Sequence, residues 1–412
     1  MISADRIDKA SAIIHDVVIK TPLIRNYNLS KKYNCNIYLK REDMQVVRSF
    51  KIRGAYHKMK TMGRESLSRG VICASAGNHA QGVAFACSAL KINGIIFMPT
   101  TTPRQKISKV KHFGGEWIEV RLVGDTFDDA SKVAVRFSND EGLPYIHPFN
   151  DEEVIAGQGT VAKEILDEML SPVDILFVAV GGGGLISGVG SYFRQKSPVT
   201  KIIAVEAEGA PALAESLKAG HLVKLDKIDS FADGIAVQEV GDKTFEICKK
   251  VTDQIVLVPE GKICSSILSL YNDEAIVVEP AGAISFAALD YFKEEIKGKH
   301  VVIIVCGGNN DITRTEDIRE RALLWEGRKH YFIIRFPQRA GALRDFLNLL
   351  GPDDDIAHFE YTKKTNRETG PALVGIEFKS QEDYLPLVDR MVAASINFEH
   401  INSNPMLFEM LV

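Results

Sequence analysis

One stretch decides the fold of this chain: Asp174-Ile175-Leu176-Phe177-Val178-Ala179-Val180-Gly181-Gly182-Gly183-Gly184-Leu185. Its first half is apolar almost throughout, which is typical of a strand covered on both faces of a sheet. Glycines in succession are costly in conformational entropy unless the backbone must approach another group closely. A helix pattern follows the glycines. Strand, glycine loop and helix together aim backbone N–H groups at one point and predict a phosphate-binding site.

The glycine loop matches neither G-x-G-x-x-G nor the nucleotide-triphosphate loop, so a dinucleotide or a nucleoside triphosphate is not the first choice of ligand. A second interpretation stays open, namely a tight turn from strand to helix. One or two glycines would be enough for such a turn.

Strands alternate with helices along most of the chain, which predicts an α/β fold with a mostly parallel sheet flanked by helices. Ligands bind such sheets at the carboxyl ends of the strands. Polar, glycine-bearing loops follow three of the strand segments, and we expect them on one rim. The strand segments are 36–40, 71–74, 95–99, 117–120, 174–180, 201–206, 254–258 and 300–305, and the three loops are 75–79, 181–185 and 306–309.

Lys51 lies in Ser49-Phe50-Lys51-Ile52-Arg53-Gly54-Ala55, ahead of a helix that we expect over 55–62. Set against Phe50 and Ile52, its amine would lose part of its hydration. Desolvation disfavours the charged form, lowers the pKa and makes the amine a nucleophile able to form a Schiff base. The alternative is an ordinary solvated lysine. The nearby segment 41–43 reads as a polar edge without a role.

Composition excludes several classes of protein. The chain has 412 residues and a formal net charge of -4, which leaves no electrostatic footprint for nucleic acid. It shows neither a signal-peptide pattern nor an apolar run long enough to span a membrane. Its six cysteines are scattered without a CxxC pair. They fit a reducing cytoplasm better than a disulfide framework or a zinc site, so no metal is predicted.

The pattern restarts after a charged, helical connector near 316–328. A strand is expected over 331–336, a helix over 342–350, strands near 357–361 and 373–378, and a helix over 381–394. This βαββα module is too short to extend the main sheet and predicts a separate domain.

Four motifs taken together resemble the fold-type II pyridoxal-phosphate enzymes, which have a tryptophan synthase β-like fold. They are Ser49–Ala55, Ser75–Gly82, the glycine loop, and Val278-Glu279-Pro280-Ala281-Gly282-Ala283. Within that family the chain is similar to the biosynthetic threonine dehydratases (threonine ammonia-lyases). The tail resembles the single ACT-like regulatory domain of their short form, through 336–339, 341–343 and 367–375. The resemblance implies a catalytic region over 1–318 with a small subdomain at about 50–145, a connector over 319–328, and an α+β ACT-like domain over 329–404.

The resemblance also implies roles for individual residues. Lys51 would carry pyridoxal 5'-phosphate as a Schiff base and later take the Cα proton. Asn78 would bind the ring hydroxyl, Cys306 would face the pyridine nitrogen, and Gly181, Gly182, Gly183, Gly184 and Leu185 would cradle the phosphate. The substrate carboxylate would go to the loop of Ser75, Ala76, Gly77 and His79, with His79 itself mainly structural. The implied reaction converts L-threonine, or L-serine, to a 2-oxo acid and ammonia; with threonine it commits carbon to isoleucine.

Two positions bear on the choice of reaction. Family members commonly have serine at the place of Cys306, and a thiol cannot hold a proton on the ring nitrogen as a carboxylate would. A largely neutral pyridine favours β-elimination over racemisation. The alternative is that Cys306 is only a small buried residue. Serine racemases carry a serine where this chain has Ala76, which argues against racemase activity.

The remaining assignments are open. Glu279 either lines the site, or it caps or pairs locally. Glu206 could bind a cation, although no ligand spacing establishes it. The resemblance implies isoleucine as inhibitor, bound near Arg339, Gly341, Ala342 and Leu343, and a cytoplasmic homotetramer. Ala340 replaces the usual proline, and the tail could instead serve oligomerisation alone. The competing functions are a catabolic serine/threonine dehydratase and a catalytically inactive amino-acid sensor.

Overall fold

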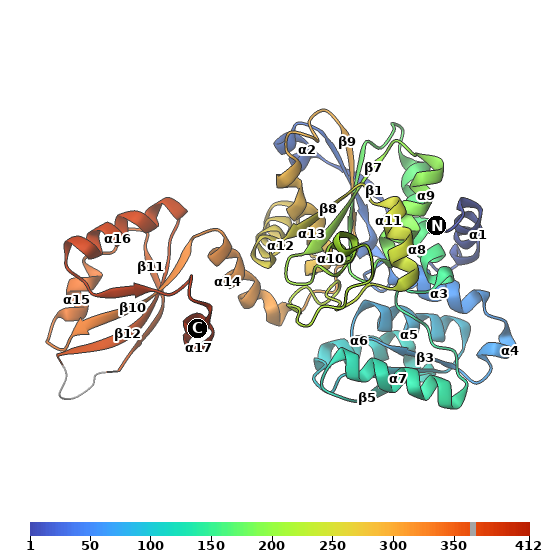
Figure 1. Cartoon of the computed structure of the whole chain (residues 1–412), viewed down its shortest axis with the longest axis horizontal. Helices are drawn as coiled ribbons and strands as arrows, with labels where there is room; N and C mark the ends of the chain where they lie inside the picture. The colour runs from blue at the N-terminus through green and yellow to red at the C-terminus, as the bar shows by residue number, and fades with distance from the viewer. Residues whose placement is uncertain (363–367) are drawn as a thin grey trace. The chain divides into compact units, whose positions relative to one another are not determined.

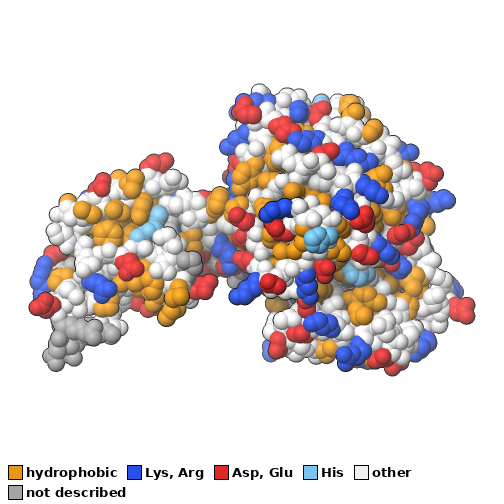
Figure 2. Space-filling model, in the orientation of Figure 1, with side chains coloured by type: hydrophobic (Ala, Val, Ile, Leu, Met, Phe, Trp, Pro, Cys, Tyr) orange, Lys and Arg blue, Asp and Glu red, His pale blue; other side chains and the backbone are white. Residues whose placement is uncertain are grey.

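The computed structural model describes residues 1–362 and 368–412. They fall into two compact units, residues 1–312 and 313–412 (Figure 1). No helix among the described residues is long and apolar enough to cross a membrane. Basic and acidic side chains are interspersed on the face shown in Figure 2, in keeping with the small net charge. Arg367, part of the tail motif, lies outside the described residues.

The larger unit is built on a six-stranded sheet with the order β1-β2-β9-β6-β7-β8. All neighbouring pairs are parallel except β1 with β2. The strands are β1 Leu23–Asn26, β2 Asn36–Arg41, β6 Ile175–Ala179, β7 Lys201–Ala207, β8 Gln254–Val258 and β9 His300–Val305. Every residue of β6 is buried, as the apolar stretch predicted. The sequence indicated only a chain break where β1 lies.

Helices cover both faces of this sheet. In Figure 1, α1, α8 and α9 lie to one side of the strands, and α12 and α13 lie to the other. The helices are α1 Ala4–Ile14, α2 Tyr27–Tyr33, α8 Glu152–Glu168, α9 Gly184–Lys196, α10 Ala212–Ala219, α11 Asp242–Val251, α12 Glu260–Glu274 and α13 Pro280–Ala287. Short 3-10 helices occur at Glu42–Met44, Gly115–Trp117, Ala288–Phe292, Ile312–Arg314 and Gln381–Asp383.

A second, three-stranded parallel sheet has the order β3-β4-β5. Its strands are β3 Val71–Ala74, β4 Gly94–Met98 and β5 Ile118–Leu122, and its helices are α3 Lys51–Thr61, α4 Arg64–Leu67, α5 Asn78–Leu90, α6 Arg104–Gly114 and α7 Phe127–Glu141. The expectation of one common rim is therefore correct for 181–185 and 306–309, since β6 and β9 are neighbours. It is wrong for 75–79, because β3 pairs with β4 around a core of its own.

Buried charges anchor α3. Arg53 is fully buried and makes paired hydrogen bonds to Glu42 (2.7 and 2.8 Å) and to Glu164 of α8 (2.7 and 2.8 Å). Lys40 of β2 also contacts Glu164, at 2.7 Å. The interpretation of 41–43 as a polar edge is wrong for Glu42, which is buried because Arg53 pairs with it. The helix begins at Lys51 and not at 55, since this network fixes its first turn.

The smaller unit is α+β. Its antiparallel sheet has the order β11-β12-β10-β13. The strands are β10 Lys329–Pro337, β11 Asp355–Tyr361, β12 Thr369–Glu377 and β13 Phe398–His400, and the helices are α14 Thr315–Trp325, α15 Ala342–Leu347, α16 Tyr384–Ala393 and α17 Pro405–Leu411. One apolar core joins α15 and α16 to the sheet. The sequence did not indicate β13, a strand of three residues.

Candidate active site

The glycine loop joins β6 to α9 and leaves little room for side chains. Gly183 has a φ of 85°, which favours glycine. A Cβ on Gly182 would overlap the ring of Phe149, and one on Gly181 would lie 2.7 Å from the carbonyl oxygen of Ile235. No side chain caps α9. The first N–H groups of a helix have no intrahelical partner, so the loop offers donors to an anion.

Lys51 is the first residue of α3, and its Nζ donates to the carbonyl oxygen of Pro148 at 3.0 Å. The amine lies 5.3 Å from the centre of the Phe50 ring. Desolvation lowers the pKa of Lys51 to about 8, although Cys306 and Glu279 act in the opposite direction. The residue after Pro148 is the Phe149 that covers the glycine loop. The nucleophilic amine and the anion cradle are therefore neighbours.

Asn78, the first residue of α5, connects the two sheets. Its Nδ2 donates to Glu279 Oε1 at 2.6 Å, and its Oδ1 accepts from Asn309 Nδ2 at 2.7 Å. Burial, with Asp233 nearby, raises the pKa of Glu279 to about 7. The structure thus pairs Glu279 with Asn78, a residue distant in the sequence that is proposed to bind the cofactor.

Cys306 follows β9, and its Sγ donates to the carbonyl oxygen of Ala281 at 3.1 Å. Burial raises the pKa of this thiol well above its usual value, so the group stays protonated. The backbone carbonyl of Cys306 accepts from the N–H of Phe50 at 3.2 Å. This bond fixes the segment that carries Lys51 to the end of the large sheet.

The 75–79 loop lies at the start of α5. Ser75 Oγ accepts from the N–H of Gly77 at 3.2 Å. The Nε2 of His79 lies 2.8 Å from the carbonyl oxygen of Ile146. Burial and the nearby Lys51 lower the pKa of His79 to about 3, which keeps the ring neutral. Ala76 is half-buried and offers no side-chain donor.

Sequence reasoning missed His147. Its Nδ1 accepts from the N–H groups of Phe149 (3.2 Å) and Asn150 (2.8 Å), and its ring meets that of Phe149 edge to face at 4.7 Å. Burial, then Lys51, lowers the pKa of His147 to about 4. A neutral His147 holds the turn that supports both Lys51 and the glycine loop. The sequence does not indicate this role, because the turn meets Lys51, 97 positions away from Pro148, only in the folded chain.

Glu206 is buried, and its two carboxylate oxygens accept from the N–H groups of Leu213 and Ala214, each at 2.8 Å. Within residues 1–362 and 368–412, no group of three or more His, Cys, Asp or Glu side chains could hold a metal ion. The contacts of Glu206 that the structure shows are these two bonds to backbone N–H groups of α10.

The family model "Pyridoxal-phosphate dependent enzyme" matches residues 14–307, and the model "C-terminal regulatory domain of threonine dehydratase" matches 320–411. The biosynthetic L-threonine dehydratase of Halalkalibacterium halodurans is 58% identical over 98% of this chain and 97% of its own length. That of Bacillus subtilis is 57% identical over 100% and 98%. The chain belongs to the threonine dehydratase family. The resemblance drawn from the motifs, the fold class and the pyridoxal-phosphate cofactor are confirmed.

The larger unit is also similar to solved structures. The processed form of threonine deaminase isoform 2 from Solanum lycopersicum has a TM-score of 0.73 at 43% identity, covering 78% of this chain and 89% of that one. Maize serine racemase has a TM-score of 0.72 at 32% identity, covering 78% and 98%. A protein named as a racemase therefore has a similar fold, so the fold alone does not decide the reaction and individual residues must.

The residues present fit pyridoxal phosphate. The phosphate needs several donors in a space free of side chains, and the glycine loop with the uncapped start of α9 provides that. The aldehyde needs an amine of lowered pKa, which Lys51 provides. In addition, Ser49 Oγ and His79 Nδ1 are buried without a hydrogen-bond partner among the described residues. Polar groups left in that state usually serve a bound group or water.

The predicted effector residues lie in the regulatory domain, between β10 and α15. Arg339 forms an ion pair with Asp345 at 2.6 Å. Gly341 has a φ of 85° and precedes α15, Ala342 is buried, and Leu343 is exposed. The structure brings these four residues together, and Arg339 is already paired by its own loop.

Proposed function

We propose that the chain deaminates L-threonine to 2-oxobutanoate and ammonia with pyridoxal phosphate, the first committed step of isoleucine biosynthesis. The observation that carries the proposal is the amine of Lys51, with a lowered pKa, beside the glycine cradle. Relatives named biosynthetic L-threonine dehydratase at 57–58% identity over nearly the whole chain support the choice of substrate.

The cofactor would be held at both ends. Lys51 would hold its aldehyde carbon, the N–H groups of 181–185 its phosphate, and Asn78 its ring hydroxyl. When bound, pyridoxal phosphate supplies a carbonyl that takes up amines and an electron sink for charge at the substrate Cα. Asn78 is kept in place by Glu279 and Asn309, so its amide does not need to be reordered on binding.

Lys51 also accounts for proton transfer. With the substrate bound, Nζ would be able to accept the Cα proton, because a pKa of about 8 leaves a useful unprotonated fraction near neutral pH. The substrate carboxylate would lie against Ser75, Ala76, Gly77 and the start of α5. His79, neutral and bonded to Ile146, would shape this loop without exchanging protons.

Elimination is favoured over racemisation by two side chains. The thiol of Cys306 donates a hydrogen bond to the carbonyl oxygen of Ala281 and stays protonated. It therefore cannot stabilise positive charge on a ring nitrogen. Ala76 carries no group that could return a proton to Cα from the opposite face. Both side chains support elimination over racemisation as the proposed reaction.

The regulatory domain implies an effector, and we propose isoleucine, bound near Arg339, Gly341, Ala342 and Leu343 as an inhibitor. The catalytic region would span 1–318, with its small subdomain at about 50–145, a connector at 319–328 and the ACT-like domain at 329–404. A cytoplasmic homotetramer completes the proposal. All six cysteines are free and buried, which suits a reducing compartment.

The test is a titration of the purified enzyme. With pyridoxal phosphate, we expect 2-oxo acid formation from L-threonine that falls as isoleucine is added, and none from Lys51→Ala. Turnover indifferent to isoleucine but raised by nucleotides would point to a catabolic dehydratase. Absence of both turnover and cofactor absorbance would support the inactive sensor and overturn the proposal.

A further inference from the structure

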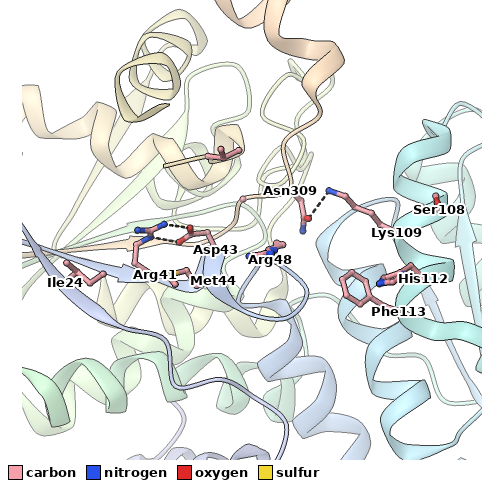
Figure 3. A pocket seen from close by; sticks show the side chains of 12 residues that line it. Ile24, Arg41, Asp43, Met44, Arg48, Ser108, Lys109, His112, Phe113 and Asn309 are labelled. Carbon is pink, nitrogen blue, oxygen red and sulfur yellow. Dashed lines mark hydrogen bonds and ion pairs between the residues drawn. The ribbon is translucent and has the colours of Figure 1, made fainter. Parts of the chain in front are cut away.

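A separate pocket of about 880 Å³ opens between the two sheets of the larger unit, and Asn309 lines it (Figure 3). One wall is α6, with Lys109, His112 and Phe113. The other wall carries Arg48, which stands three positions before Lys51. Neither the proposed cofactor residues nor the effector residues line it.

The pocket is basic. Arg41, at its edge, is neutralised by two hydrogen bonds to Asp43, at 2.9 and 2.7 Å. Arg48 and Lys109 form no ion pair with a carboxylate of the described residues. Lys109 Nζ reaches only the amide oxygen of Asn309, at 3.3 Å, a long bond (Figure 3). Cationic side chains from two elements, aimed into one hollow without a counter-ion, favour an anionic ligand.

The same pocket has an apolar part. Met44 and Val277 line it with 43% and 54% of their surface exposed, and the ring of Phe113 lies on the α6 wall. Large apolar side chains exposed in a concave site are typical of ligand pockets. A bare inorganic ion would leave them in water. The lining therefore suits an organic anion in which a charged head is joined to an apolar body.

Asn309 connects this pocket to the catalytic residues. Its Oδ1 accepts from Lys109, and its Nδ2 donates both to Asn78 Oδ1 (2.7 Å) and to the carbonyl oxygen of Val47 (2.8 Å). Arg48 has a φ of 59°, and its carbonyl oxygen accepts from the N–H of Gly308 at 2.9 Å. A residue other than glycine held in this region stores strain. A ligand that draws Lys109 away from Asn309 would change the support of Asn78.

We propose that this pocket is a second ligand site in the catalytic region, that it takes a small organic anion bearing a phosphate or carboxylate, and that its occupancy alters the cofactor site through Asn309. Binding itself is independent of the proposed function; only the sign of any effect on turnover rests on it.

The test uses the full-length enzyme loaded with pyridoxal phosphate, so that the glycine cradle is filled. Phenyl phosphate and benzoate are titrated by calorimetry, and the tighter of the two identifies the preferred head group. We expect Lys109→Ala to weaken binding about tenfold, the size of one charge-assisted contact. Lys111→Ala, on α6 but outside the pocket, serves as the matched control and should bind like wild type.

A second readout tests the coupling. Saturating phenyl phosphate should shift the absorbance or fluorescence of the bound cofactor in wild type, and this shift should be lost in Lys109→Ala. The proposal is overturned if neither probe binds, if Lys111→Ala weakens binding as much as Lys109→Ala, or if binding leaves the cofactor spectrum unchanged. A change of oligomeric state in Lys109→Ala, without probe binding to wild type, would assign the pocket to a subunit interface instead.

Discussion

The chemistry of Lys51 depends on what surrounds its amine. The group keeps one hydrogen bond, to Pro148, and lies near the Phe50 ring, and no carboxylate of the described residues forms an ion pair with it. Desolvation consequently outweighs the distant negative charges and lowers the pKa to about 8. The same side chain on the surface would stay charged at neutral pH.

This pKa predicts how cofactor loading depends on pH. The reactive form is the neutral amine, which becomes dominant as the pH rises through about 8. We expect the rate at which apoenzyme takes up pyridoxal phosphate to rise up to about pH 8 and then level off, measured by stopped-flow absorbance. A rate still rising near pH 10 would indicate an ordinary lysine pKa of about 10.4.

The raised pKa of Glu279 predicts how the stability of the fold depends on pH. Its pKa is raised from 4.5 to about 7 in the folded protein, so the folded state binds the proton more tightly than the unfolded state. Its ionisation therefore destabilises the fold progressively between pH 4.5 and 7. Glu279→Gln removes this cost, and its free energy of unfolding relative to wild type should improve by roughly 2–3 kcal/mol across that window.

Urea unfolding of the cofactor-free protein at pH 5 and pH 7.5 measures the difference. If the two proteins lose or gain stability in parallel over this range, Glu279 does not carry the raised pKa.

At the scale of the element, the turn from β6 to α9 depends on how closely Phe149 approaches the glycine loop. Gly182 and Gly184 leave room for Phe149, which a Cβ on either residue would contact too closely. The loop is therefore shaped by the segment around Pro148 as much as by its own sequence. That segment also accepts the hydrogen bond from Lys51.

We expect Gly182→Ala to weaken pyridoxal phosphate binding by about tenfold or more, because the loop must move away from Phe149. Overpacking of this kind should also lower the free energy of unfolding by about 1–3 kcal/mol. Cofactor titration monitored by absorbance, with urea unfolding, measures both.

Gly63→Ala is the matched control, since its Cβ would meet no atom within 4 Å. Adding Phe149→Leu to Gly182→Ala should restore part of the affinity. Wild-type affinity in Gly182→Ala would show that the loop tolerates a side chain.

At the scale of the whole molecule, helix α14 belongs to the smaller compact unit, residues 313–412. The helix α14 shares contacts with the regulatory sheet: Leu324 packs against a cluster containing Tyr331, and the Tyr331 hydroxyl donates to Glu320 at 2.7 Å. Lys329 also pairs with Glu320. A cut after residue 326 would leave the apolar side of α14 without its partners.

We therefore expect a chain ending at Ile312 to be more soluble than one ending at Glu326. Both should keep threonine turnover and lose inhibition by isoleucine, because the proposed effector residues lie beyond both ends. Assays of turnover against isoleucine concentration, with sedimentation of both truncations, check this. Inhibition that persists in either truncation would place the effector site in the catalytic region.

The sequence by itself determined the features that depend on local pattern. Apolar strands, the glycine run and the motif around Lys51 were sufficient to predict the α/β class, the family and its cofactor. Each of these features is a continuous stretch of the sequence. Only the tertiary structure decided what depends on distant partners. Glu42 is buried because Arg53 pairs with it, His147 matters because its loop folds back on Lys51, and β3 joins a second sheet because it has its own core.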